Sequence, residues 1–106
     1  MEFVETSIFE KVSKTFLSED ELHQLQMTLS IYPTIGVIIQ GASGLRKLRW
    51  MSSGKGKRSG LRIIYYLVTQ EHKIFLLYVY KKSKQENLHS DYLRYLRSLV
   101  GGIQYE

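Results

Sequence analysis

Residues 41–66 read GASGLRKLRWMSSGKGKRSGLRIIYY, two strand-like runs joined by a loop rich in Gly, Ser, Lys and Arg. In the first run, 45–51, successive side chains point to opposite faces: Leu45, Lys47 and Arg49 to one, Arg46, Leu48 and Trp50 to the other. The second run, 61–68, is more apolar and has Arg62 as its one charge. A turn at 71–73 and a run at 74–80 that is apolar on both faces come next. Together they predict an antiparallel meander of three strands whose last strand is central in the sheet.

The residues before this stretch predict a short strand and two helices. Residues 2–6 alternate weakly, which favours a strand, and Ser7 is a suitable N-cap for a helix with an apolar stripe at Ile8, Phe9, Val12 and Phe16. A capping box at 18–21, with a hydroxyl first and a carboxylate three residues later, begins a second helix. Tyr32-Pro33 ends that helix after about residue 30, so we expect a helical hairpin.

The remaining segments complete a single α+β domain over residues 1–106. Residues 36–44 are interpreted as a connection that Val37, Ile38 and Ile39 anchor to the core. Ser90 is the expected cap of a C-terminal helix that ends at Gly101-Gly102, with an apolar stripe at Tyr92, Tyr95, Leu96, Leu99 and Val100. The order is strand, two helices, meander and helix, with neither an internal repeat nor a linker.

The charges are unevenly distributed along the chain. No acidic residue lies between Glu21 and Glu71, and the basic residues in that interval are Arg46, Lys47, Arg49, Lys55, Lys57, Arg58 and Arg62. The net charge is +5, and it comes mostly from this block. A positive surface of this kind attracts phosphate or an acidic protein. The alternative is a solvated basic loop that has no ligand.

Composition excludes several kinds of chemistry. The chain has no Cys, which excludes a disulfide scaffold, a zinc–thiolate site and a cysteine nucleophile. His23, His72 and His89 are not at metal-ligand spacing, so we expect no metal site. The N-terminus does not read as a signal peptide, and no apolar run approaches the roughly 20 residues of a membrane span. We therefore expect a soluble cytoplasmic protein that does not bind a membrane.

Two positions outside the loop are candidates for phosphate binding. Arg62 lies one residue inside an apolar strand, which can hold its guanidinium rigidly against a phosphate; alternatively it ends the strand and reaches into water. A second basic cluster, Tyr80-Lys81-Lys82-Ser83-Lys84, follows the last strand. The Gly54–Gly60 loop lacks the glycine spacing of a nucleotide-binding P-loop, and a strand follows it rather than a helix.

The sequence resembles the HigB branch of the RelE/ParE toxin superfamily over nearly its whole length. The resemblance rests on GLRKLRW at 44–50 and GKGKRSGLRIIYY at 54–66, supported by LSEDE at 17–21 and LYVYKK at 77–82. It implies a compact antiparallel sheet with two N-terminal helices on one face. It also implies the toxin of a type II toxin–antitoxin pair, which cuts mRNA on the ribosome without a metal or cofactor. Its partner would be an antitoxin, usually a small helix-turn-helix protein.

The resemblance also implies roles for individual residues. Arg62 would bind the scissile phosphate, and Lys82 would be a second phosphate contact or the leaving-group acid. Tyr80 and Tyr92 are the nearest counterparts of a catalytic tyrosine that relatives have near the C-terminus, and Ser83 or Lys84 stands where relatives have an arginine. The residues expected to bind RNA or the ribosome are Lys47, Arg49, Lys55, Lys57, Arg58, Lys81 and Lys84.

Two other functions fit the same resemblance. The ParE branch inhibits DNA gyrase with this fold and is not a nuclease, and one fold can carry several functions. A catalytically inactive regulator that binds only its antitoxin is the third possibility. In every case, the basic surface predicts an antitoxin that is acidic where it contacts the protein.

Overall fold

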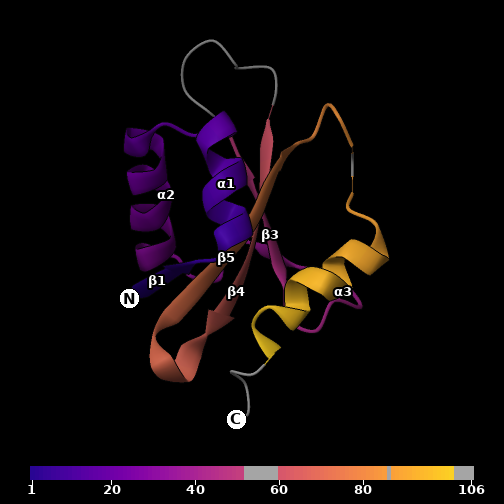
Figure 1. Ribbon diagram of the computed structural model, residues 1–106. Coiled ribbons are helices and arrows are strands. Elements are labelled where there is room, and N and C mark those ends of the chain that lie inside the picture. The colour runs from indigo at the N-terminus through magenta and orange to yellow at the C-terminus, as the bar shows by residue number, and fades with distance from the viewer. Residues whose placement is uncertain (52–59, 86, 102–106) are drawn as a thin grey trace.

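The computed structural model describes residues 1–51, 60–85 and 87–101, and in these segments it contains three helices and a five-stranded sheet (Figure 1). The strands are β1 (Glu2–Glu5), β2 (Val37–Ile38), β3 (Arg46–Trp50), β4 (Leu61–Val68) and β5 (Lys73–Lys81). The helices are α1 (Ser7–Phe16), α2 (Glu19–Ile31) and α3 (Ser90–Ser98). This arrangement confirms the predicted α+β class.

The sheet has the strand order β1-β5-β4-β3-β2. The predicted meander is present, because β3, β4 and β5 pair antiparallel in sequence order, and β2 joins β3 antiparallel. β1, however, lies parallel to β5, with Glu2 opposite Lys73 and Glu5 opposite Leu76. The sheet is therefore mixed rather than wholly antiparallel. This pairing joins residues about 70 positions apart, so no local turn signal could have revealed its direction.

The two N-terminal helices begin as their capping residues dictate. Thr6, one residue before the predicted cap, accepts a hydrogen bond from the Phe9 N–H through its hydroxyl at 3.2 Å. The predicted capping box of α2 is present. The Glu21 N–H donates to the Ser18 hydroxyl at 3.1 Å, and the Ser18 N–H donates to the Glu21 carboxylate at 3.0 Å. His89, rather than Ser90, caps α3.

The connection after α2 is held mainly by polar contacts. Val37 and Ile38 form the edge strand β2 and are 71% and 50% exposed, so the prediction that they anchor this segment was wrong for these two residues. Ile39, the third predicted anchor, is partly buried and does pack against a core cluster. The Tyr65 hydroxyl instead accepts a hydrogen bond from the Gly36 N–H at 2.9 Å and donates one to the Pro33 carbonyl at 2.8 Å. Arg46 Nη1 donates to the Gly36 carbonyl at 2.8 Å. The pattern of apolar residues did not reveal these hydrogen bonds, because their partners are backbone N–H and carbonyl groups.

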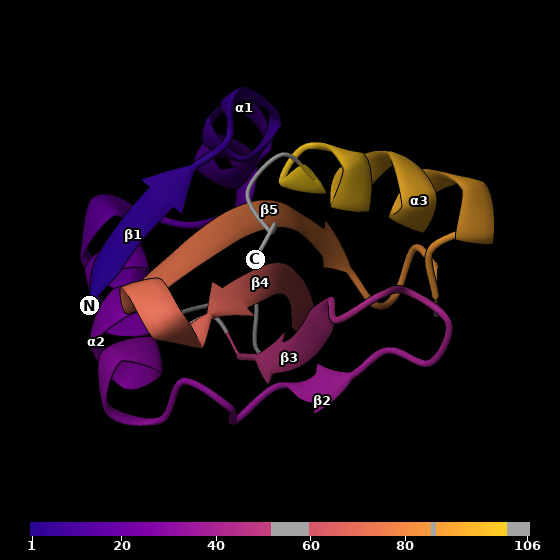
Figure 2. The same ribbon diagram turned by 90° about the horizontal axis from the view of Figure 1, so that it is seen from below.

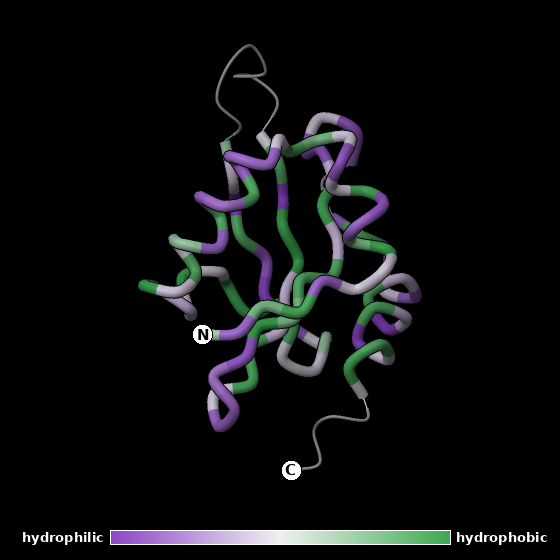
Figure 3. The backbone as a smooth tube through the Cα atoms, turned by 60° about the vertical axis from the view of Figure 1, so that its left-hand side comes forward, coloured by the Kyte–Doolittle hydropathy of each residue, from purple (hydrophilic) through white to green (hydrophobic). Residues whose placement is uncertain are grey.

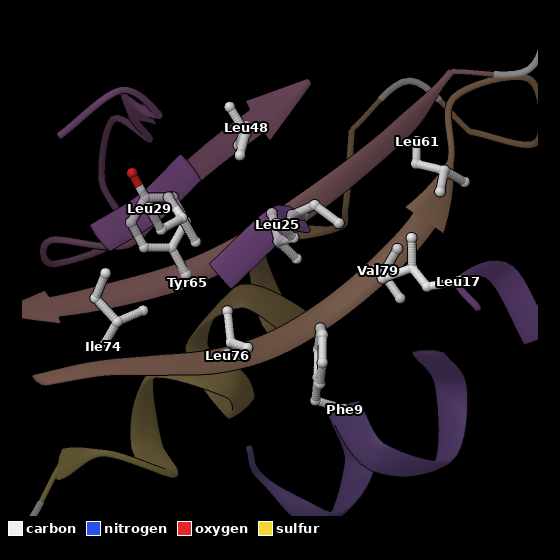
Figure 4. Packing of buried hydrophobic residues seen from close by; sticks show 11 residues of the cluster. Phe9, Leu17, Leu25, Leu29, Leu48, Leu61, Tyr65, Ile74, Leu76 and Val79 are labelled. Carbon is white, nitrogen blue, oxygen red and sulfur yellow. The ribbon is translucent and has the colours of Figure 1, made fainter. Parts of the chain in front are cut away.

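Each face of the sheet carries its own apolar cluster. On one face, Phe9 and Leu17 from the first helical segment and Leu25 and Leu29 from α2 pack against the strands (Figure 4). This cluster confirms that the two N-terminal helices cover one face. On the other face, α3 contributes Leu96 and, just beyond its end, Val100; these pack with the sheet residues Ile64, Leu77 and Tyr80. β4 and β5 are largely hydrophobic along their length (Figure 3), as strands covered on both faces must be.

Candidate functional site

Three sequence-predicted residues form one row across the sheet, which we call the Arg62 row. Arg49 of β3 lies directly opposite Arg62 of β4, and Arg62 lies directly opposite Tyr80 of β5. Cross-strand partners project from the same face of a sheet. Because Tyr80 packs in the cluster that includes α3, the row lies on the α3 side. The register thus brings together residues that are 31 positions apart in the sequence.

Arg62 is a buried cation, with 7% of its surface exposed. Its Nη1 donates to the Leu61 carbonyl at 3.3 Å. Within the described residues, no Asp or Glu forms an ion pair with it. Burying a charge without an opposite charge is costly, and an anion bound here would supply the missing partner. The alternative that Arg62 reaches into water does not fit its low exposure.

Tyr80 and Lys82 lie at the same end of the sheet as Arg62. Tyr80 is 5% exposed, which leaves little of its ring open to solvent. Lys82 is one residue past β5, and its backbone N–H donates to the Gly60 carbonyl at 3.0 Å, so the pairing with the β4 strand continues to this point. Its side chain is exposed. The start of β4 and the end of β5 therefore place a buried guanidinium and an exposed ammonium at the same end of the sheet.

Lys47 belongs to the next row of the same face, opposite Ile64, which in turn is opposite Tyr78. Its ammonium donates to the Asn87 side-chain oxygen at 2.7 Å. This pair and Tyr80 line a small pocket of about 100 Å³, together with Ile39, Ile64, Leu88 and Leu93. Sequence reasoning missed Asn87 and Leu88, because nothing in their local sequence shows which strand they contact.

The other predicted basic residues do not join the Arg62 row. Lys81 is paired with Leu61, whose side chain packs in the cluster of α1 and α2, so Lys81 belongs to the opposite face. Lys84 is exposed in the turn after β5, where its N–H donates to the Lys81 carbonyl at 3.1 Å. The predictions for Lys55, Lys57 and Arg58 lie outside the described residues.

Tyr92, one of the two candidate catalytic tyrosines, lies on α3, and its ring contacts are with tyrosines. Its ring packs edge-on against Tyr78, with the centroids 5.1 Å apart, and against Tyr95 at 5.6 Å. Burial, and after it the neighbouring Tyr78, raises the pKa of Tyr92 to about 12. A phenol with that pKa stays protonated at neutral pH and is a poor general base. Tyr80, in the row itself, is therefore the better candidate for a catalytic role.

The described residues form neither a cluster of metal ligands nor a membrane-spanning helix. Across residues 1–51, 60–85 and 87–101, no three His, Cys, Asp or Glu side chains come together as a metal site would require. His23 is on α2, His72 is in the left-handed turn before β5, and His89 caps α3. Of the helices described, none is long and apolar enough to cross a membrane.

Comparison with known proteins identifies the fold. No family model matches the chain. Among solved structures, the chain is similar to E. coli toxin RelE, in the free state of an arginine-to-alanine double mutant, with a TM-score of 0.53 and 21% sequence identity. The match covers 80% of this chain and 86% of that chain. The chain therefore has the RelE fold, as its sequence predicted; the comparison does not separate the HigB branch from other proteins with this fold.

Proposed function

We propose that this protein is the toxin of a type II toxin–antitoxin pair and acts in the cytoplasm as a ribosome-dependent mRNA endoribonuclease of the HigB branch. The observation that carries the proposal is the buried Arg62, which has no ion-pair partner among the described residues and lies in a row with Tyr80 on a RelE fold. An RNA phosphate is an anion that the planar, five-donor guanidinium can bind through two parallel hydrogen bonds. The toxin name of RelE and the basic centre of this chain agree with that substrate.

The proposed reaction uses the RNA's own 2′-hydroxyl. Its oxygen attacks the adjacent phosphorus, a P–O bond to the 2′-oxygen forms, and the bond to the 5′-oxygen breaks, which leaves a cyclic phosphate and a free 5′-hydroxyl. Arg62 binds the phosphate and stabilises the additional negative charge of the transition state. The Lys82 ammonium donates a proton to the leaving 5′-oxygen, and Tyr80 contacts the reacting nucleotide opposite Arg62. The proton of the 2′-hydroxyl passes to solvent or to a ribosomal group.

The basic surface also defines the partners in this proposal. Lys47 and Arg49 extend the positive face around Arg62, and Lys84 extends it beyond the end of β5. mRNA and ribosomal RNA supply phosphates to this surface, while an antitoxin with acidic side chains competes for it. The proposed antitoxin is a small helix-turn-helix protein.

The test is a cleavage assay on ribosomes programmed with a defined mRNA, read by mapping new 5′ ends. Arg62→Ala should lower the cleavage rate about 100-fold to 1,000-fold, as removal of one transition-state charge contact typically does. Arg94→Ala is the matched control: it also removes one positive charge, but from an exposed site on α3 paired with Asp91, and its rate should stay within about twofold of wild type. Cleavage at the wild-type rate by folded Arg62→Ala would overturn the proposal.

A further inference from the structure

Four tyrosine rings form a continuous series that starts at the Arg62 row. The centroids of Tyr80 and Tyr78 are 6.3 Å apart, those of Tyr78 and Tyr92 are 5.1 Å apart, and those of Tyr92 and Tyr95 are 5.6 Å apart. Tyr78 and Tyr80 point to the same face of β5 because they are two residues apart. Tyr92 and Tyr95 are three residues apart on α3 and so are neighbours on its surface.

The last three of these tyrosines line a groove between α1 and α3, which we call the tyrosine groove. It has a volume of about 370 Å³, and Ser7 and Lys11 of α1 form its opposite wall. Figure 2 shows α1 and α3 side by side above β5, which agrees with this lining. No described residue that lines the groove is acidic. Glu10, on the same helix, lines a different pocket with Glu5 and Glu19.

The tyrosine edge of α3 is not explained by packing alone. Leu96 and Val100 are both 0% exposed and attach the helix to the sheet. Tyr95 lies outside that cluster and is 48% exposed, while Tyr78 and Tyr92 are partly buried. The exposed ring of Tyr95 and the exposed ammonium of Lys11 thus present a stacking surface and a cation in one groove.

Aromatic rings combined with cations are the usual recognition surface for single-stranded nucleic acid. Bases stack on the rings with little regard to sequence, and lysine or arginine follows the phosphates. The tyrosine groove has both parts, and its tyrosine series begins with Tyr80 of the proposed catalytic row. The ring contacts from Tyr80 through Tyr78 therefore link the proposed catalytic row to this groove along β5.

We propose, on the basis of the proposed function, that the tyrosine groove binds mRNA nucleotides next to the cut: their bases stack on Tyr95 and Tyr92, and Lys11 contacts their phosphates. The groove would then contribute affinity for the strand and not the chemistry of cleavage. It would tolerate different bases, because each base presents a π-face to the rings.

The test measures affinity for ribosomes that carry an mRNA with 2′-O-methyl groups in the decoding site, because such an mRNA cannot be cut. Tyr95→Ala and Lys11→Ala should weaken binding, the former by about fivefold to 100-fold, which is the usual effect of losing one stacked base. Tyr32→Ala and Lys14→Ala are the matched controls and should bind as wild type: Tyr32 is 61% exposed at the end of α2, and Lys14 lines a different pocket. With 4-thiouridine in the mRNA, crosslinks should map to α3.

The outcomes separate this inference from the proposed function. If wild type cleaves unmodified mRNA but Tyr95→Ala and Lys11→Ala bind like their controls, with no crosslink on α3, the groove inference is overturned and the proposed function stands. If the two variants instead weaken only the binding of an antitoxin, the groove is a protein-binding site and the inference is likewise overturned. Absence of cleavage by the wild type would contradict the proposed function itself.

Discussion

At the scale of single residues, Arg62 combines a structural cost with a proposed functional role. A guanidinium that is 7% exposed, with no described carboxylate as an ion-pair partner, loses hydration without full compensation. Residues held for function often oppose stability in this way. The position opposite Tyr80 keeps the charge fixed, because both strands are internal to the sheet.

This cost gives a stability prediction that is independent of activity. Arg62→Met, which keeps the length of the side chain and removes its charge, should raise the free energy of unfolding by about 1 kcal/mol or more. Arg49→Met is the control, because Arg49 is exposed and its replacement should change stability by no more than about 0.5 kcal/mol. Urea denaturation followed by circular dichroism measures both. A clear loss of stability in Arg62→Met would show that the buried cation is compensated.

The Tyr65 hydroxyl makes the main hydrogen bonds that hold the 33–36 segment. Tyr65→Phe removes the acceptor of the Gly36 N–H and the donor to the Pro33 carbonyl. Because this leaves a buried N–H without its partner, we expect a loss of about 1–3 kcal/mol in the free energy of unfolding. Tyr66→Phe should cost less, since its hydroxyl accepts only a part-buried bond from Arg97 at 3.3 Å. Equal effects of the two changes would contradict this assignment.

At the scale of elements, the start of α2 depends on its capping box. Ser18→Ala removes the acceptor of the Glu21 N–H and should lower the free energy of unfolding by about 1 kcal/mol. Ser30→Ala, an exposed serine in the last turn of the same helix, should change it by no more than about 0.5 kcal/mol. Thermal unfolding of both variants under one buffer condition gives the comparison, and the prediction fails if the two melt together.

The elements that were predictable are those with local signals. The apolar run at 61–68 matches β4 residue for residue, and the Ser18–Glu21 pattern marks the start of α2 correctly. The predicted N-caps of the other two helices, Ser7 and Ser90, are each one residue late, since the observed caps are Thr6 and His89. In both cases two polar residues are adjacent, and either could cap the helix. β2 and the direction of β1 were missed because pairing across the sheet determines both.

The candidate site was predictable in its residue types but not in its arrangement. The absence of acids around Arg62 and its place in an apolar strand marked it from the sequence. Strand register places Tyr80 and Arg49 on either side of Arg62 and turns Lys81 to the opposite face. The hydrogen bond between Lys47 and Asn87 joins residues 40 positions apart. Neither the register nor this long-range contact can be read from a single sequence, because a shift of one residue in strand register moves every side chain of that strand to the other face of the sheet.

At the scale of the whole molecule, the Arg62 row lies at one end of the sheet face that carries α3. α1 and α2 cover the opposite face, and α3 lies along only part of its own face, so the Arg62 row remains at the end where β4 begins and β5 ends (Figure 1). Both the row and the tyrosine groove adjoin β5. The central strands thus connect the proposed chemistry with the proposed strand-binding surface.

The buried tyrosines predict loss of stability in alkali. Burial raises the pKa of Tyr65 and raises that of Tyr92 to about 12, from 10.0 for a free phenol. The unfolded chain therefore releases these protons at lower pH than the folded chain, so stability is present below pH 10 and is lost as the pH rises towards 12. Urea midpoints measured from pH 8 to pH 12 should fall above pH 10, and less steeply in Tyr92→Phe. A constant midpoint would contradict the assigned burial.

The proposed nuclease activity on the ribosome depends on Arg62. The most direct measurement is controlled induction of wild type and Arg62→Ala at equal protein level in cells, with protein synthesis and mRNA 5′ ends followed together. We predict rapid loss of translation and new 5′ ends in frame with codons for the wild type, and neither for the variant. Growth arrest with intact mRNA and broken DNA, or equal arrest by Arg62→Ala, would contradict the claim.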